Sequence, residues 1–187
     1  MSLRIHTYSP SEIPALCDQP LSVSQLQALA DDIVAYVDRY RPEYSRLVRL
    51  QQSAGNRVQE MFEPERWSFP TSGSVQIRPQ KGNATRVISL QDLGFNSSDA
   101  LSPVLADMAR LPRGQYERAV TKAAKDIGLW RLYESGFAHP STHFFRHLKI
   151  KSMRAENFDL DFIASWIGEK NVKNLNYYIE SQFFCEL

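Results

Sequence analysis

A change of hydrophobic period limits the folds open to this chain more than any other feature of its sequence. Apolar residues recur at helical intervals over most of the chain, first at Leu26, Leu29 and Ile33. Over one short central stretch they alternate with polar residues instead. The two periods indicate helix and strand, respectively. We therefore expect an α+β fold, mainly α-helical, in which a small antiparallel β-sheet or hairpin packs on helices.

The helices are expected where the helical period meets start and stop signals. The first begins at Ser22 or Ser24, both of which are good N-cap residues, and ends before Pro42. Further helices are expected over about 43–55, 56–63, 98–110, 114–127, 143–154, 159–167 and 171–184. The sequence holds no internal repeat, so these helices belong to one structural unit.

The alternating stretch predicts a β-hairpin. Residues 74–78 and 86–90 are two strand-like runs, and the polar residues between them include Gly82-Asn83. Residues 1–20 contain three prolines and little periodicity. We expect them to form an irregular lead-in, followed by a single domain over 21–187.

Composition excludes several classes of protein. The 187 residues are 43% hydrophobic and 23% charged, which is ordinary for a folded domain with a sizeable core. No apolar run is long enough for a membrane helix, and the N-terminus lacks the apolar region of a secretory signal. Cys17 and Cys185 offer neither a zinc pattern nor a disulfide framework, so a reducing, cytoplasmic setting is expected. The net charge is only +1, so a nucleic acid would have to bind a local basic face.

Two segments in the first half of the chain carry cations at turns. Arg57 follows Gly55 and precedes Glu60 by three positions. Taken alone, that segment is a helix–helix turn with an exposed Arg–Glu pair. Lys81 lies at the tip of the expected hairpin, from which its side chain could reach a bound phosphate. The alternative is an ordinary solvated turn lysine.

Two segments in the second half add an imidazole, a guanidinium and phenols. His143 and Arg146 lie three positions apart on an expected helix, so they share one face. Arginine binds phosphate oxygens with a planar fork, and histidine can donate or transfer a proton. A buried histidine beside a surface arginine is the alternative. Tyr177 and Tyr178 suit a core or an interface, but a phenolate can also attack phosphorus if cations stabilise it.

In this order the segments resemble the catalytic domain of the tyrosine recombinases, the phage-integrase family. Gly55-Asn56-Arg57-Val58-Gln59-Glu60 is similar to the first-arginine box of that family, T-G-L-R-x-x-E. Lys81-Gly82-Asn83, with Arg86-Val87-Ile88-Ser89-Leu90 behind it, is similar to the hairpin-lysine box, K-G-N-K-x-R. His143-Phe144-Phe145-Arg146-His147 is similar to H-x-L-R-H.

The spacing extends this resemblance over nearly the whole chain. Gly168 lies 25 residues after His143, where family members commonly have the glycine of L-G-H. Tyr178 lies nine residues after Glu169, which is the usual position of the nucleophile. The resemblance therefore favours Tyr178 over Tyr177 as the attacking group.

Glu169 departs from the family pattern, which has histidine or tryptophan at this position. An ionised carboxylate accepts hydrogen bonds but cannot donate one to a phosphate oxygen. Two like charges about 4 Å apart repel by roughly 4 kcal/mol at an effective dielectric near 20. Three outcomes are open: a protonated Glu169, a Glu169 that turns away while Lys170 supplies charge, or a domain that binds DNA but cleaves poorly.

The resemblance implies a metal-free phosphoryl transfer on duplex DNA that needs no cofactor. Tyr178 would attack a backbone phosphate to form a 3′-phosphotyrosyl link. Arg57 and Arg146 would hold the non-bridging oxygens, and Lys81 would protonate the leaving 5′-oxygen. His143 would assist proton transfer at the tyrosine.

The resemblance also implies partners. They are double-stranded DNA, further copies of the chain in a tetrameric synapse, and accessory DNA-bending proteins, all on the nucleoid in the cytoplasm. Glu60 would orient Arg57. Basic residues that could face DNA, or could simply be solvated, are Arg110, Arg113, Arg118, Lys122, Lys125, Lys149, Lys151 and Arg154.

Two other functions remain as alternatives to a site-specific recombinase. One is a DNA-binding module on the same fold whose cleavage is impaired by Glu169. The other is a helical protein-interaction domain whose motifs match by coincidence. The chain is either the catalytic part of a longer integrase or a natural single-domain recombinase.

Overall fold

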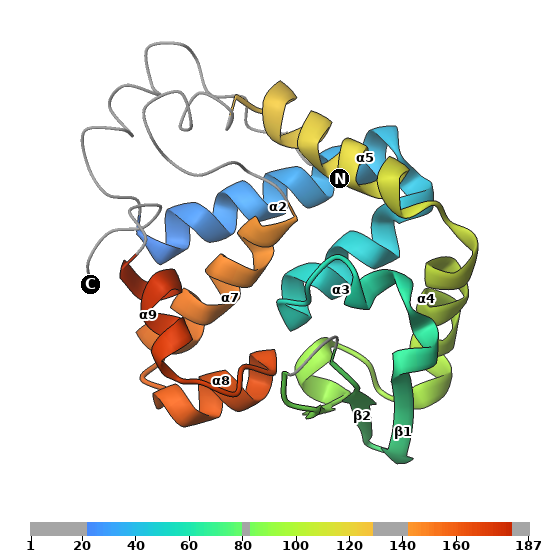
Figure 1. Ribbon diagram of the computed structural model, residues 1–187. Helices are drawn as coiled ribbons and strands as arrows, with labels where there is room; N and C mark the ends of the chain where they lie inside the picture. Colours follow the sequence, from blue (N-terminus) through green and yellow to red (C-terminus); the bar gives the residue numbers. More distant parts are fainter. Residues whose placement is uncertain (1–21, 80–82, 129–141, 181–187) are drawn as a thin grey trace.

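The computed structural model describes residues 22–79, 83–128 and 142–180. The fold is mainly helical with one small sheet, as the change of period predicts (Figure 1). The α-helices are α2 (Val23–Tyr40), α3 (Ser45–Ala54), α4 (Ser98–Arg110), α5 (Arg113–Asp126), α7 (His143–Ala155), α8 (Leu160–Ile167) and α9 (Lys173–Glu180). The strands are β1 (Trp67–Thr71), β2 (Ser74–Ile77) and β3 (Arg86–Ser89). Single 3-10 turns are η1 (Pro42–Tyr44), η2 (Glu60–Phe62), η3 (Pro64–Arg66) and η4 (Gln91–Leu93).

The first helix begins where its N-cap signal predicts. The Ser22 hydroxyl accepts a hydrogen bond from the Gln25 backbone N–H, and the Gln25 side chain accepts one from the Ser22 N–H. This reciprocal pair satisfies two backbone donors that a helix start leaves open. The expected helix over 56–63 is wrong in extent, because the chain forms only the turn η2 there.

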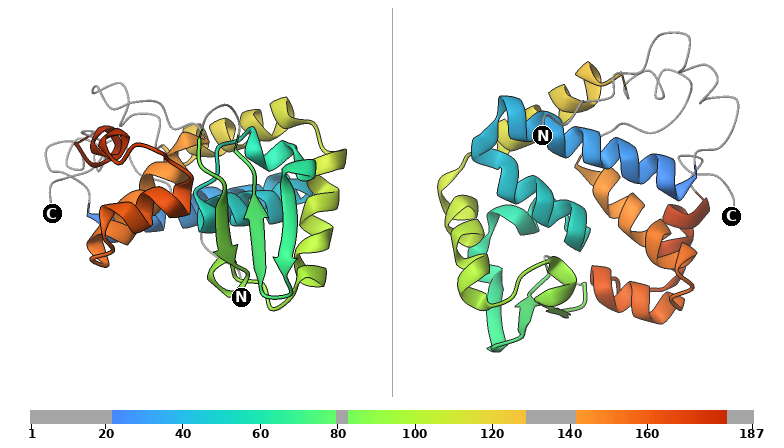
Figure 2. Two further views of the ribbon diagram at one scale, coloured as in Figure 1. Left: turned by 60° about the horizontal axis from the view of Figure 1, so that its bottom comes forward. Right: turned by 180° about the vertical axis from the view of Figure 1, so that it is seen from behind.

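The sheet has three antiparallel strands in the order β1-β2-β3, one more than the predicted hairpin. Strand β1 was not expected because its sequence lacks alternation: Trp67 is buried, whereas the other four residues, including Pro70, are exposed. Such a pattern is typical of an edge strand. Figure 2 shows α8 beside β3 and α4 beyond β1.

Helix α3 lies at the centre of the molecule and contacts α2, α4 and α7 (Figure 1). The main apolar core surrounds it and includes Leu47, Leu50 and Phe145, none more than 1% exposed. A smaller cluster joins α7, α8 and α9; its buried members are Ile150, Met153, Ile163, Ala164, Ile167 and Leu175. The half-buried Trp166 packs against both clusters. The chain after residue 155 is therefore held mainly by this second, smaller core.

Several expectations fall on residues outside the described ranges. These are the lead-in over 1–20, the hairpin tip at Lys81, and the end of the last expected helix after residue 180. In the described part of the chain, no helix has both the length and the apolar character that crossing a bilayer requires.

Candidate active site

The arginines of the two separated boxes meet on one oxygen atom. Arg146 Nη2 donates a hydrogen bond to Glu169 Oε1 over 2.9 Å, and Arg57 Nη2 donates to the same Oε1. The side chains of Arg146 and Glu169 are 0% and 5% exposed, respectively, and that of Arg57 is 23% exposed. Two guanidinium groups therefore converge on a single anionic site that opens to solvent on the Arg57 side.

The end of α3 positions both guanidinium groups. Gly55 closes this helix with φ of +64°, and a Cβ there would lie 2.9 Å from the Cβ of Lys149. Glycine therefore lets α3 and α7 approach closely. Arg146, on α7, donates to the Gly55 carbonyl over 3.2 Å, and Arg57 lies in the turn that follows.

A buried amide, which sequence reasoning missed, joins the Arg57 turn to the start of α7. Gln51 Nε2 donates to the carbonyls of Asn56 (3.0 Å) and Thr142 (3.2 Å), and Tyr116 Oη donates to Gln51 Oε1 (2.6 Å). Thr142 directly precedes His143. Nothing in the sequence of α3 marks Gln51 as a site residue, because its partners Thr142 and Tyr116 lie far along the chain.

Glu169 points inward. It follows Gly168, which ends α8 with φ of +74°, and its N–H donates to the Ala164 carbonyl over 2.8 Å. Lys170 is exposed. The expectation that Glu169 turns away and Lys170 supplies charge is therefore wrong, because the paired guanidinium groups attract the carboxylate inward.

Arg86 is a second buried arginine, which sequence analysis missed as a site residue, and Glu60 connects it to Arg57. Arg86 is 2% exposed; its Nη2 donates to Glu60 Oε2 (2.6 Å) and to Asn56 Oδ1, and its Nη1 donates to the Trp166 carbonyl (3.2 Å). Burial lowers the pKa of Arg86 to about 10, although Glu60 opposes the shift. The signal was the parity of β3: Arg86 and Ile88 face inward, whereas Val87 is exposed.

Glu60 links Arg86 to Arg57. Its Oε2 accepts the Arg57 backbone N–H over 3.1 Å, and its Oε1 lies 3.9 Å from Arg57 Nη1. The contacts agree with the expected role of Glu60 in orienting Arg57, and they also make it the counter-charge of Arg86.

Two histidines on α7 sit in a cationic environment. His143, the first residue of the helix, is exposed at the surface; partial desolvation and then the charges of Arg146 and Arg57 lower its pKa. One turn on, burial and then His143, Lys151 and Arg146 lower the pKa of His147 to about 4. Both imidazoles are therefore neutral at pH 7, a state in which an imidazole can accept a proton.

For the two remaining predicted site residues, Tyr178 and Lys81, the side chains lie outside the described part of the structure. Tyr178 lies on α9, which packs against α7, and only the course of its backbone is described. Lys81 lies outside the described residues. Glycine 168 nevertheless brings the hairpin near the site: its carbonyl accepts the Ala84 N–H over 3.1 Å.

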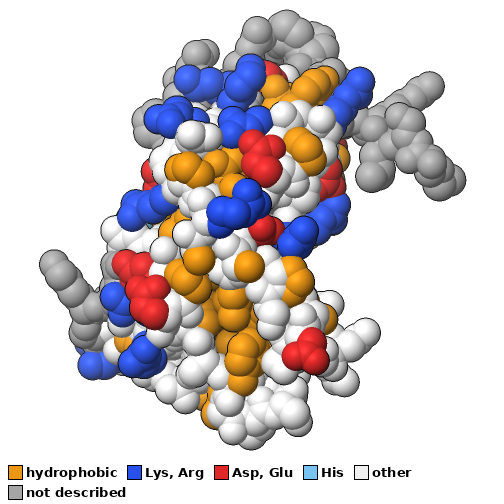
Figure 3. Space-filling view, turned by 90° about the vertical axis from the view of Figure 1, so that its right-hand side faces the viewer, with side chains coloured by type: hydrophobic (Ala, Val, Ile, Leu, Met, Phe, Trp, Pro, Cys, Tyr) orange, Lys and Arg blue, Asp and Glu red, His pale blue; other side chains and the backbone are white. Residues whose placement is uncertain are grey.

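Several residues of the predicted basic face are packed in the fold or paired with acidic side chains. Lys151 is 7% exposed, and Lys149 lies over the Trp166 ring, with its Nζ 4.6 Å from the ring centroid, so neither belongs to a solvated surface. Arg110, Arg113 and Lys122 form ion pairs with acidic neighbours on their own helices or helix ends. Figure 3 shows Lys and Arg gathered over the half of this side that holds α5, whereas an apolar strip lies over the half that holds the sheet.

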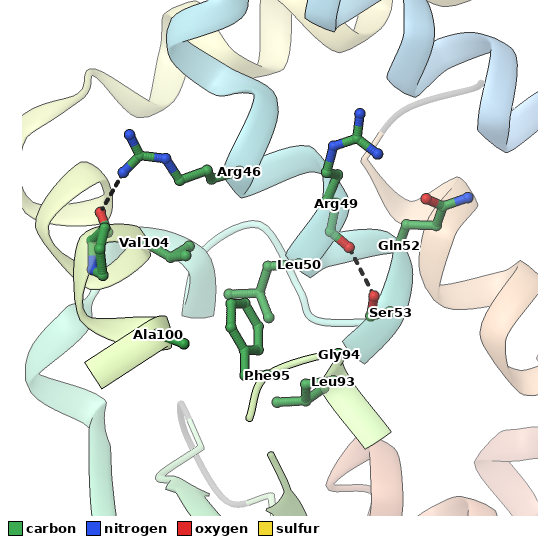
Figure 4. Close-up of a pocket in the computed structure, with 11 residues that line it drawn as sticks. Arg46, Arg49, Leu50, Gln52, Ser53, Leu93, Gly94, Phe95, Ala100 and Val104 are labelled. Atoms are coloured by element: carbon green, nitrogen blue, oxygen red, sulfur yellow. Dashed lines mark hydrogen bonds between the residues drawn. The ribbon is translucent and has the colours of Figure 1, made fainter. Parts of the chain in front are cut away.

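A separate pocket of about 540 Å³ lies between α3, η4 and α4. Apolar side chains, among them Leu50 and Phe95, line it below Arg46 and Arg49 (Figure 4). Both arginines are already paired, with Asp107 and Asp38, respectively. Of the predicted site residues whose side chains the structure describes, none lines this pocket. Among the described residues, no group of three or more acidic, histidine or cysteine side chains could hold a metal ion.

Solved structures share the fold, although no family model and no curated protein matches the sequence. A lambda integrase(75-356) dimer bound to a COC' core site has a TM-score of 0.61 and 19% identity, over 86% of this chain and 58% of that chain. A lambda integrase dimer bound to a COC' core site has a TM-score of 0.60 and 17% identity, over 86% and 47%. XerA recombinase has a TM-score of 0.57 and 16% identity, over 86% and 60%.

The protein therefore has the fold of the tyrosine recombinase catalytic domain, as the motifs predicted. The chain spans less than two thirds of the length of each of these proteins. At such low identities the likeness establishes the fold, and the roles of individual residues are matters for proposal.

Proposed function

We propose that this protein is a DNA strand transferase of the tyrosine recombinase type, which cleaves and rejoins strands through a 3′-phosphotyrosyl intermediate. The observation that carries the proposal is the convergence of Arg57 and Arg146 on one anionic oxygen. These residues lie in boxes that the chain separates by 89 positions. Paired guanidinium groups in a largely buried site suit the extra charge of a phosphoryl transition state.

In the proposed reaction, the Tyr178 oxygen attacks the scissile phosphorus as the bond to the 5′-oxygen breaks. Neutral His143 accepts the phenolic proton, and Lys81 gives a proton to the departing 5′-oxygen. Arg57 and Arg146 hold the two non-bridging oxygens throughout. The phosphodiester energy is kept in the phosphotyrosyl link, so a new 5′-hydroxyl can reverse the step without a nucleotide cofactor.

The partners proposed are double-stranded DNA and further copies of this chain. The integrase structures with the same fold are dimers bound to core sites, which supports self-association on DNA, up to a tetrameric synapse. The second candidate is a DNA-binding module with impaired cleavage. Glu169 favours it, because its carboxylate lies where a phosphate oxygen would have to bind.

Covalent capture on DNA tests the proposal. The protein is incubated with nicked duplexes that carry a randomised core, and adducts that resist SDS are isolated and sequenced. Adducts should form with the wild type and with Tyr177→Phe but vanish with Tyr178→Phe. Salt-sensitive DNA binding with no adduct would support the binding module, and adducts that persist in Tyr178→Phe would exclude the assigned nucleophile.

A further inference from the structure

Glu169 offers the arginines the kind of oxygen that a substrate phosphate would offer. Its Oε1 accepts hydrogen bonds from Nη2 of both Arg57 and Arg146. Carboxylate and phosphate oxygens compete for guanidinium groups because both accept charge-assisted hydrogen bonds. An incoming oxyanion and Glu169 therefore cannot both use these donors.

We propose that Glu169 is an internal ligand that keeps the oxyanion site closed, and that the site opens only when this carboxylate leaves the two arginines. The inference rests on the proposed function, since it concerns access to the same site. A carboxylate in place of the usual imidazole or indole thereby turns a position that would assist the reaction into one that regulates it.

The charge balance distinguishes Glu169 from a purely structural partner. Glu169 is the carboxylate that both guanidinium groups contact within hydrogen-bond distance. Glu60 forms a longer ion pair with Arg57, over 3.9 Å, but it is also the counter-charge of the buried Arg86. Three guanidinium groups therefore share two carboxylates, and positive charge remains in excess. Arg57 Nη1 is buried and has no hydrogen-bond partner among the described residues. Once Glu169 leaves, the Nη2 groups of both arginines and the excess positive charge would be available to an anion, which would enter on the partly exposed Arg57 side.

The place of Glu169 in the chain provides a means of release. It follows the left-handed turn at Gly168, where α8 ends, and Lys170 and Asn171 beside it are exposed. The connection leads within a few residues to α9, which carries Tyr178. Movement of this short connection would withdraw the carboxylate without unfolding α7, on which Arg146 lies.

The cost of closure appears as a loss of apparent affinity. A protein that is open for only one molecule in a hundred binds its ligand about 100-fold more weakly than the open form does. Removal of the charge from Glu169 should therefore raise the affinity for a small oxyanion by about tenfold or more.

Inorganic sulfate is a suitable probe because it needs neither DNA nor Tyr178. Sulfate binding is measured by calorimetry and by sulfate-dependent thermal stabilisation at constant ionic strength. Glu169→Gln should bind sulfate at least about tenfold more tightly than the wild type, and the melting temperature of the variant should rise with sulfate. Glu65→Gln removes the same charge at an exposed carboxylate and should match the wild type.

Glu169→Asp covers the case in which Glu169→Gln does not fold. It keeps the charge but shortens the reach to both arginines, so sulfate binding should still exceed that of the wild type. Equal sulfate affinity in the wild type and in every folded Glu169 variant overturns the proposal. A second variant, Glu169→Gln with Arg146→Met, should lose the gain, and retention of the gain would place the bound ion elsewhere and also overturn it.

The outcomes separate this inference from the proposed function. Tighter sulfate binding in Glu169→Gln without any DNA adduct supports the internal ligand and argues against strand transfer. Adduct formation at equal rates in the wild type and Glu169→Gln, with equal sulfate affinity, supports strand transfer and rejects the internal ligand.

Discussion

Two buried arginine–glutamate clusters lie side by side in this protein, and they differ in how their charges are matched. In the first, Arg86 donates to Glu60, to the Asn56 amide oxygen and to the Trp166 backbone carbonyl. In the second, Arg57 and Arg146 share one carboxylate, that of Glu169, at the start of a connection between helices. The first cluster is balanced, with one carboxylate at 2.6 Å from one buried guanidinium group. The second is unbalanced, because two guanidinium groups share the Glu169 carboxylate, Glu60 adds only a 3.9 Å ion pair to Arg57, and Arg57 is partly exposed.

The difference indicates separate roles for chemically similar groups. A buried charge with fixed partners on several segments holds those segments together, and removal of one partner leaves a costly unpaired charge. A pair of guanidinium groups that share one carboxylate can bind an anion in its place, because carboxylate and phosphate oxygens accept the same charge-assisted hydrogen bonds. The balanced cluster should therefore govern stability, whereas the unbalanced one should govern anion binding.

The largest effect expected concerns the balanced cluster. Arg86→Met should lower the free energy of unfolding by about 3–5 kcal/mol, because the carboxylate of Glu60 stays buried without its main partner. Arg113→Met is the matched control, since it removes an exposed arginine paired with Glu117 and should cost less than about 1 kcal/mol. Urea unfolding of both variants measures the difference. Equal losses would show that the Arg86 cluster is not a structural centre.

A smaller loss of folding stability is expected at low pH, where His147 on α7 becomes protonated. Burial, followed by the charges of His143, Lys151 and Arg146, lowers the pKa of His147 to about 4. Between this value and the ordinary one near 6.5, the unfolded chain binds more protons than the folded one. The stability that neutral His147 contributes is therefore present above about pH 6.5 and is lost as the pH falls towards about 4, by up to about 3 kcal/mol.

Urea unfolding at about pH 7 and about pH 5 measures this dependence. The wild type should lose more stability between the two than His147→Gln, which lacks the titrating group. A pH dependence that is the same in both proteins would mean that burial and the neighbouring positive charges do not lower the pKa of His147.

The smallest effect concerns the glycine that lies between the clusters. A Cβ at Gly168 would meet the Ala84 carbonyl oxygen at 2.9 Å, in addition to the strain of φ at +74°. Gly168→Ala should therefore cost about 2 kcal/mol of stability and displace both Glu169 and the end of the hairpin.

Gly94→Ala is the control for backbone strain alone, because its φ is +84° and no atom lies within 4 Å of the added Cβ. It should cost about 1 kcal/mol. Thermal melts of both variants give the comparison. If the two costs were equal, the close approach of Gly168 to Ala84 would make no difference to the cost of the added methyl group.

Local signals in the sequence predicted much of the fold. The serine N-cap at Ser22, the glycine stop at Gly55 and the alternating runs around β2 and β3 lie where the structure has them. Strand β1 was missed because its outward face is exposed and holds Pro70, so the alternation that marks a half-buried strand is absent. The order and spacing of the boxes indicated the fold of the whole chain.

The candidate site was predicted less completely, since its chemistry depends on contacts between distant segments. Arg57 and Arg146 were identified by motif, but the role of Arg86 depends on Glu60 and Trp166, which belong to other segments of the fold. Gln51 likewise has partners 65 and 91 positions away. No local pattern encodes such pairs, because a buried polar side chain is identified by what surrounds it.

The amino-acid sequence alone determined most of the helices and the pairing of β2 with β3, because periodicity and caps are local properties. The order of its boxes also identified Arg57 and Arg146. Only the tertiary structure decided the state of Glu169. Its partner Arg57 lies 112 positions away, and a carboxylate turns inward or outward according to the field that distant charges create once the chain has folded. Closure of the anion site is thus a property of the assembled fold, even though each group in it can be read from the sequence.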